Sequence, residues 1–193
     1  MKRADVKDRK LVIDILVEAF EPLDEDNSIN FVVKQDGRRK ERMQILMGYL
    51  FDKALRSGAV FLSDNYASCL LVSYSNKERL TLASLISTLQ MAFKCIGIER
   101  VVKVLRRQHV VKRNYPKTAH IRPMIFAVKS KFKGGVTAPR LIMQVFDEFK
   151  GNKLPVIVDA ASEHNVRLYQ KFGLQVFNVE EGLGFPIYLL RMN

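Results

Sequence analysis

The sequence predicts one α/β (α+β) domain over residues 1–193, and three observations support this. The chain is long enough to bury a core, and 48% of its residues are hydrophobic. Segments with apolar residues at helical spacing alternate with short apolar runs typical of strands. No repeat, low-complexity tract or linker divides the chain. We therefore expect a sheet flanked by helices.

The chain is predicted to start with two helices and a hairpin. Residues 8–20 carry apolar side chains at helical spacing, and residues 37–57 form a second helix after a polar loop. Residues 59–63 and 67–74 are short apolar runs joined by a polar turn, which is typical of a β-hairpin.

Two further helices are predicted over residues 77–96 and 99–112, as a long connection at about 77–113. Apolar residues repeat along the first at spacings of three and four, namely Leu82, Leu85, Ile86, Leu89, Phe93 and Ile96. Polar residues interrupt the segment that starts at Leu80, so we expect an amphipathic helix packed on the sheet or on a partner, and no membrane span. The second helix is expected to bury Val101, Val104 and Leu105 and to expose its basic residues.

The second half of the chain alternates between strands and helices. The predicted elements are a strand at 120–128, a helix at 137–150, a strand at 155–159, a helix at 163–172, and strands at 174–179 and 185–191.

The formal net charge of +12 indicates an anionic partner, such as a phosphorylated cofactor, an acidic protein or nucleic acid. Many of the charges fall in a run from Arg100 to Arg113, which is also typical of a solvated helix face. No aromatic residues that would stack bases are interleaved there, so nucleic acid is disfavoured.

Cys69 and Cys95 lie in apolar segments, without the short Cys or His spacing of a metal site. We therefore expect buried thiols, no disulfide and no metal. The first residues contain no apolar signal region, which together with the thiols favours a cytoplasmic setting.

The most informative stretch is residues 155–179, where the predicted helix places Asn165 and Tyr169 on one face because they are four residues apart. Ser162 suits the N-cap of this helix, and Gly173 suits the left-handed residue that ends it.

This stretch resembles the second signature block of the GNAT superfamily of acyl-CoA-dependent N-acyltransferases, which has a small-residue turn, an Asn, a Tyr four residues later and a Gly before the next strand. The resemblance implies a mixed, mostly antiparallel sheet that splays apart between its fourth and fifth strands. Residues 120–128 and 155–159 correspond to these two strands. It also implies that acetyl-CoA, or another acyl-CoA, inserts its pantetheine arm into the gap.

A turn before the predicted helix at 137–150 suits a pyrophosphate, because helix N-termini offer free N–H groups and a positive dipole. The family's phosphate-loop pattern falls on Lys133, Val136 and Ala138, and Val136 stands where that pattern has glycine. A β-branched residue resists positive φ. Either Gly134 and Gly135 supply the flexibility instead, or the loop binds CoA poorly.

The resemblance implies that Tyr169 protonates the departing thiolate, that Asn165 binds the cofactor arm, and that backbone N–H groups of the fourth strand stabilise the oxyanion. The expected cofactor-binding residues are Phe126, Ala127, Val128, Lys133, Gly134, Gly135, Val136, Thr137, Ala138, Asn165 and Tyr169. The candidates for a general base are His120 and Asp159.

In the resembled fold, the loop between the first two helices borders the acceptor cleft. Four acidic residues lie in it here, namely Glu21, Asp24, Glu25 and Asp26. They suggest a cationic amine acceptor, although a solvated loop is an alternative explanation.

The sequence thus favours an acetyl-CoA-dependent N-acetyltransferase that acts on an amine of a small molecule or a protein. The alternative is a catalytically degenerate CoA-binding module or a basic module that binds macromolecules. A homodimer is compatible with the enzyme.

Overall fold

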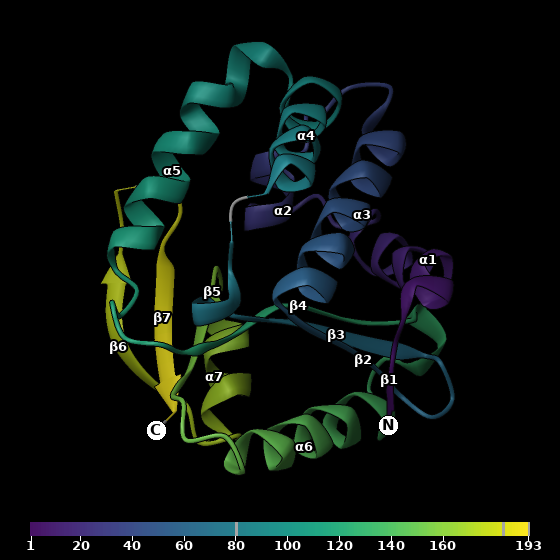
Figure 1. The fold of residues 1–193 in the computed structure, drawn as a ribbon, viewed down its shortest axis with the longest axis vertical. Coiled ribbons are helices and arrows are strands. Elements are labelled where there is room, and N and C mark those ends of the chain that lie inside the picture. The colour runs from purple at the N-terminus through teal and green to yellow at the C-terminus, as the bar shows by residue number, and fades with distance from the viewer. Residues whose placement is uncertain (80, 183, 193) are drawn as a thin grey trace.

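One seven-stranded sheet crosses the molecule (Figure 1). A computed structural model describes residues 1–79, 81–182 and 184–192. The strands are β1 (Lys2–Arg3), β2 (Gly58–Leu62), β3 (Ser68–Tyr74), β4 (Ile121–Val128), β5 (Val156–Ala160), β6 (Gln175–Glu180) and β7 (Ile187–Met192). Their order is β1-β2-β3-β4-β5-β7-β6. Only β4 and β5 pair in parallel, so the predicted mixed, mostly antiparallel sheet is confirmed.

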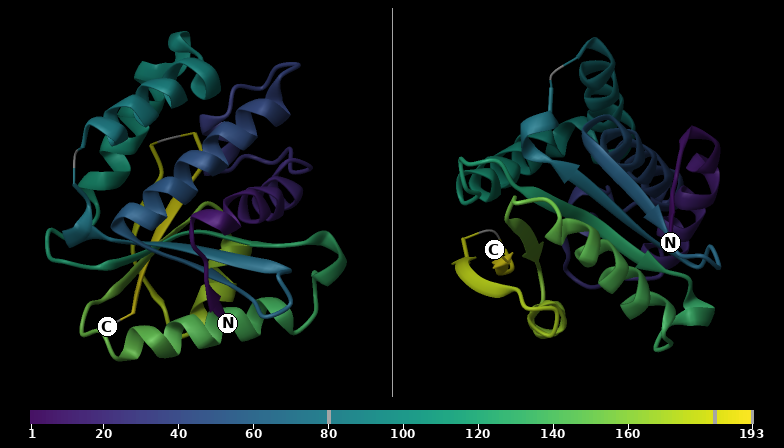
Figure 2. Two further views of the ribbon diagram at one scale, coloured as in Figure 1. Left: turned by 45° about the vertical axis from the view of Figure 1, so that its right-hand side comes forward. Right: turned by 60° about the horizontal axis from the view of Figure 1, so that its bottom comes forward.

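Helices cover both faces of the sheet. They are α1 (Arg9–Phe20), α2 (Ser28–Val32), α3 (Arg39–Ser57), α4 (Leu82–Met91), α5 (Val101–Arg113), α6 (Thr137–Lys150) and α7 (Glu163–Gln170). Figures 1 and 2 show α6 and α7 on one side of the sheet and α1, α3, α4 and α5 on the other.

The core is divided by the sheet because successive strand side chains point to opposite faces. In β3, Cys69 and Leu71 join the hydrophobic cluster under α1 and α3. Leu70 and Val72 join the cluster that includes α6 and α7. Both cysteines are free and buried, as predicted.

The sheet splays apart between β4 and β5. Their only register pair is Ile121 with Val156, and the N–H of Ile121 donates to the carbonyl of Pro155 at 2.9 Å. Beyond this point the two strands diverge, which confirms the gap that the sequence resemblance implied.

The structure adds two elements to the predicted N-terminal half. β1 pairs with β2 at the edge of the sheet. The predicted polar loop before α3 contains α2, whose N-cap Asn27 accepts a hydrogen bond from the N–H of Asn30 at 2.8 Å. Asn at an N-cap was the available sequence signal.

The apolar stripe of α4 is not packed on the sheet, so the expected packing on the sheet was wrong, whereas packing on a partner stays a prediction. Leu82, Leu85, Leu89 and Phe93 are exposed, and Ile86 is 57% exposed. Among the expected stripe residues that the structure describes, only Ile96 is buried; Leu80 lies outside the described residues. The contacts with the α1–α3 cluster come instead from Met91, the last residue of α4, and from Cys95 and Ile96 in the helical segment Ala92–Ile96 that follows it.

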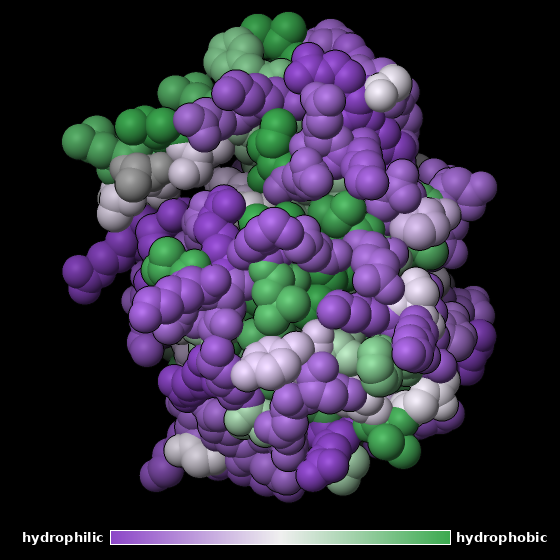
Figure 3. All heavy atoms as spheres, turned by 90° about the vertical axis from the view of Figure 1, so that its right-hand side faces the viewer, coloured by the Kyte–Doolittle hydropathy of each residue, from purple (hydrophilic) through white to green (hydrophobic). Residues whose placement is uncertain are grey.

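Figure 3 shows hydrophobic side chains gathered at the top of the molecule, where Figure 1 places α4. No helix in the described part of the chain combines the length and the apolar character needed to cross a membrane.

Helix α5 also differs from its prediction. Val104 is buried as expected, but Leu105 is exposed. Arg107 was expected on a solvated face, yet it is only 6% exposed. Its guanidinium lies between two aromatic rings, 4.5 Å from the centre of Phe31 and 3.9 Å from that of Phe185. These rings come from distant parts of the chain, so helix periodicity did not reveal them.

Candidate active site

The gap beside β4 leaves backbone donors of that strand without a strand neighbour. The N–H of Lys129 donates to the carbonyl of Ala67 at 2.8 Å, on the side of β3. Successive residues of a strand direct their N–H groups to opposite edges. The N–H of Ala127 therefore also faces β3, whereas those of Phe126 and Val128 face the gap.

A bulge in β4 marks the place where the strands separate. Its register with β3 passes from Leu71–Ile125 to Val72–Pro123, so Met124 is the extra residue. Bulges re-aim side chains and increase local twist. Met124 lines hollows on both faces of the sheet, which therefore lie back to back across the gap.

On the α6–α7 face, a small hollow of about 40 Å³ is lined by Tyr169, Phe126 and Asp159. Tyr169 is half-buried. Burial raises the pKa of its hydroxyl to about 12, and the charge of Asp159 acts in the same direction. The hydroxyl therefore keeps its proton at neutral pH, as a proton donor must.

Asp159 is held in a network of three side chains beside the gap. Its Oδ1 accepts a hydrogen bond from the Tyr115 hydroxyl and another from Nη2 of Arg122 at 3.0 Å. The Arg122 guanidinium lies 4.8 Å from the centre of the Tyr115 ring. Burial raises the pKa of Tyr115 well above its ordinary value, so its hydroxyl remains a donor.

Across the sheet, Asp159 also lines a pocket of about 270 Å³ between α3 and α5, which we call the central pocket. Figure 1 shows α5 and α3 on opposite sides of β5. Asp159 thus belongs both to the hollow that holds Tyr169 and to the pocket under α5.

A wider hollow of about 870 Å³, the outer hollow, shares Phe31 and Arg107 with the central pocket. Three of the acidic residues predicted at the acceptor cleft line it, namely Glu21, Asp24 and Asp26. Glu25 is not part of the lining. Cations of α5 line the same hollow, so the acidic loop lies near opposite charge.

His120 lies in a different place from Asp159. It is buried, its Nδ1 lies 2.9 Å from the carbonyl oxygen of Thr118, and its ring stacks on Tyr115 with 5.7 Å between centres. It lines a separate hollow of about 240 Å³. Of the two candidate bases, Asp159 is therefore the one beside the gap.

The loop before α6 has a conformation that the valine tolerates. Val136 has φ −77°, in the right-handed region, and its side chain is 79% exposed. Gly134 takes the positive φ of 76° instead, and a Cβ built there would meet no atom within 4 Å. Val136 also makes no side-chain cap for α6. The first-turn N–H groups of Thr137 and Ala138 find no partner within the helix.

Asn165 lies in the first turn of α7 and is exposed, one turn before Tyr169. As predicted, Ser162 is the N-cap, accepting from the N–H of Asn165 at 3.4 Å, and Gly173 has a positive φ of 89°. Asn165 and Tyr169 therefore share one face of α7, and of the two only Tyr169 lines the hollow.

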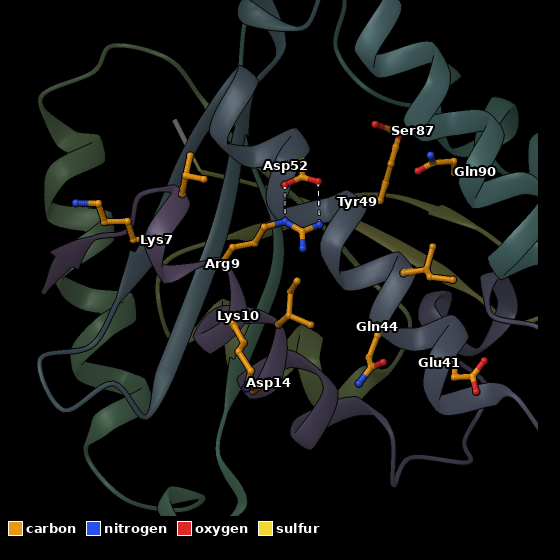
Figure 4. Close-up of a pocket in the computed structure, with 13 residues that line it drawn as sticks. Lys7, Arg9, Lys10, Asp14, Glu41, Gln44, Tyr49, Asp52, Ser87 and Gln90 are labelled. Carbon is orange, nitrogen blue, oxygen red and sulfur yellow. Dashed lines mark hydrogen bonds and ion pairs between the residues drawn. The ribbon is translucent and has the colours of Figure 1, made fainter.

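A further hollow of about 760 Å³ lies between α1, α3 and α4, away from the gap (Figure 4). Arg9 crosses it to Asp52 with two hydrogen bonds, from Nε at 3.0 Å and from Nη2 at 3.1 Å. No predicted site residue lines this hollow. Of its charged residues, Arg9 pairs with Asp52, Lys10 pairs with Asp14, and Glu41 pairs with Arg38.

Sequence reasoning missed Tyr115, Arg122 and Arg107. Arg122 did carry a signal, since a charged residue inside a short apolar strand needs a partner. Tyr115 followed a predicted helix and carried no signal. The burial of Arg107 depends on rings that only the tertiary fold brings together.

No family model matches the sequence, and no curated protein matches it. Solved structures do match in three dimensions. A structure titled as histone acetyltransferase HPA2 and related acetyltransferase, from Corynebacterium glutamicum, matches with a TM-score of 0.70 and 16% identity, over 98% of this chain and 93% of that one. A mosquito arylalkylamine N-acetyltransferase-like protein matches with a TM-score of 0.57 and 15% identity, over 99% and 97%.

A protein from Desulfovibrio desulfuricans that is assigned to the GNAT family of acetyltransferases matches with a TM-score of 0.56 and 12% identity, over 100% of this chain and 96% of that one. Identities this low establish the fold rather than the activity. The chain therefore has the fold of the GNAT N-acyltransferases.

Proposed function

We propose that the chain is an acyl-CoA-dependent N-acyltransferase, with acetyl-CoA as the acyl donor and an amine of a small molecule or a protein as the acceptor. The observation that carries this proposal is the arrangement at the gap between β4 and β5. A protonated tyrosine, Tyr169, lies on one face of it, and a carboxylate, Asp159, is reached from both faces.

The loop before α6 suits the phosphates of an acyl-CoA. Gly134 is open on the side where a Cβ would lie, and the uncapped first turn of α6 offers Thr137 and Ala138 N–H groups to an anion. Lys133 adds positive charge. Gly135 and Val136 complete the loop, and the amide of Asn165 would bind the cofactor arm.

An acyl-CoA would supply a thioester, and the chain supplies the groups around it. Asp159 would take a proton from the amine on Oδ2, because its hydrogen bonds from Tyr115 and Arg122 both use Oδ1. The N–H of Phe126 would stabilise negative charge on the carbonyl oxygen. Tyr169 would protonate the sulfur as the C–N bond forms and the C–S bond breaks. The amine thus gives one proton to Asp159, and the departing thiolate takes one from Tyr169.

The setting and the assembly of the protein belong to the same proposal. The two free, buried cysteines fit a cytoplasmic enzyme. A homodimer stays a prediction. So does the attraction of a cationic amine by Glu21, Asp24, Glu25 and Asp26.

The direct test is acetyl-CoA-dependent release of thiol, measured with a colorimetric reagent across a panel of amines. We expect turnover with at least one acceptor class, and an Asp159→Asn variant to lower it about 100-fold or more. Acetyl-CoA binding without turnover for any amine would favour the degenerate CoA-binding module. Salt-sensitive binding to generic DNA without acetyl-CoA binding would favour the basic macromolecule-binding module.

A further inference from the structure

The central pocket carries an excess of positive charge. Its charged lining residues are four cations and one anion, namely Lys53, Arg107, Lys112, Arg122 and Asp159. Asp159 pairs with Arg122 at 3.0 Å, and Lys53 pairs with Glu78 at 2.9 Å outside the pocket. Charge within a low-dielectric cavity acts strongly on a ligand. The pocket as a whole therefore favours an anionic group.

Arg107 is the best-placed of these cations. It lines both the central pocket and the outer hollow, so it lies where a molecule passes from one to the other. Phe31 and Phe185 hold its guanidinium on two sides, and burial lowers its pKa from the ordinary value. Guanidinium is a planar donor that matches the geometry of a carboxylate and stays charged at neutral pH.

The rest of the central pocket is mostly apolar. Its lining includes Ile29, Leu46, Leu50, Met91, Val104 and Ile187. Its volume of about 270 Å³ lies near the lower end of ligand pockets, which are roughly 300–1,000 Å³. This size and lining fit a small molecule with an apolar side chain.

We propose that the acceptor is a small amino carboxylic acid with an apolar side chain. Its carboxylate is held at Arg107, its side chain occupies the central pocket, and its amine reaches Asp159 at the gap. This inference rests on the proposed acyl transfer, because it assigns the acceptor of the same site.

The acidic loop is compatible with this acceptor. Asp24 and Asp26 line the outer hollow, where they can attract the ammonium group of a zwitterion. Within the central pocket, the cations then favour the carboxylate. The molecule thus meets charges of both signs along one route, as a zwitterion requires.

The test compares acceptors that differ only in the carboxylate. Leucine is paired with isopentylamine and phenylalanine with phenethylamine, and each is measured by thiol release with acetyl-CoA and by calorimetric binding to the protein. We expect kcat/KM and affinity to be at least about tenfold higher for the amino acid of each pair. Only the amino acid has the carboxylate that makes a charge-assisted contact with the protein. Equal or better performance of the decarboxylated amines would overturn the proposal.

Variants then locate the contact. Arg107→Met keeps an apolar stem between the two rings, and it is expected to lower the affinity for the amino acid about 10- to 100-fold while leaving that for the matched amine unchanged. Arg107→Lys should restore part of the loss. Lys112→Met, at an exposed position on the same helix, provides a second variant should Arg107→Met not fold, with an expected loss of a few-fold for the amino acid alone. An equal loss for both members of a pair would contradict carboxylate recognition.

Two readouts separate this inference from the proposed function. Acetyl-CoA binding in its own titration reports on the function, whereas the difference within each acceptor pair reports on the inference. Acetyl-CoA binding together with a preference for the plain amine refutes the inference alone. Absence of acetyl-CoA binding refutes the function, and the acceptor titrations still decide whether the pocket selects a carboxylate.

Discussion

The part of the chain from β4 onward and the helical pair α4–α5 differ in how their apolar and polar residues are used. From β4 onward, apolar side chains are buried against α6 and α7, and Tyr169 lies at the gap in the sheet. In α4–α5 the relation is partly inverted, since Ile86 and Leu89 face solvent while Arg107 is buried. The comparison shows that apolar residues at helical spacing identify one face of a helix, but do not identify what covers that face.

The largest effect is expected at the gap. Tyr169→Phe removes the proposed proton donor and should lower kcat about 100- to 10,000-fold, with acetyl-CoA affinity retained. Tyr188→Phe is the matched control, because Tyr188 packs against the same hydrophobic cluster and does not line the hollow. Steady-state kinetics measure kcat of the two variants, and calorimetry measures their affinity for acetyl-CoA. Equal loss in the two variants would show that Tyr169 acts only through packing.

The next effect compares buried and exposed leucines of the two regions. Leu141→Ala in α6 should lower the free energy of unfolding by about 2–5 kcal/mol, since this side chain is fully buried. Leu89→Ala in α4 should change it by less than about 0.5 kcal/mol, because the side chain is exposed. Urea unfolding measures both. A large loss for Leu89→Ala would mean that a partner or a second copy covers α4.

The pKa of the Tyr169 hydroxyl reports whether this side chain is buried at the gap. Its pKa in the folded chain is raised from 10.0 to about 12, so the protonated form is favoured by folding. This contribution to stability is complete below pH 10 and is lost as the pH rises through about 12. Tyrosinate absorbance of the native protein should therefore show a late transition that Tyr169→Phe lacks. A transition of Tyr169 near pH 10 would place its hydroxyl in water.

The smallest effect is expected in the phosphate loop. Gly134→Ala forces an alanine into positive φ, which costs about 1–2 kcal/mol, and we expect a shifted loop with about tenfold weaker acetyl-CoA binding. Gly151→Ala at the other end of α6 is the control, because its added Cβ would lie 3.7 Å from the carbonyl oxygen of Glu148, an ordinary contact. Calorimetry compares the two. Equal affinities would remove Gly134 from the proposed site.

The sequence alone predicted the features that depend on local spacing. Asn165 and Tyr169 share a helix face because they are four residues apart, and Ser162 and Gly173 bound that helix as their residue types favour. Val136 was the apparent weakness of the loop, yet the positive φ falls at Gly134.

Features that depend on distant contacts were not predictable. The bonds of Asp159 to Tyr115 and Arg122 span 44 and 37 residues of sequence. The burial of Arg107 likewise requires Phe31 and Phe185, which lie far from it along the chain. The spacing of apolar residues within one segment does not identify such distant partners.

The central claim is that the gap and the loop before α6 form an acyl-CoA site. Calorimetric titration of the native protein with acetyl-CoA tests it most directly. We predict saturable binding at one site with a micromolar Kd. Absence of binding at millimolar acetyl-CoA, in a protein shown to be folded, would contradict the claim.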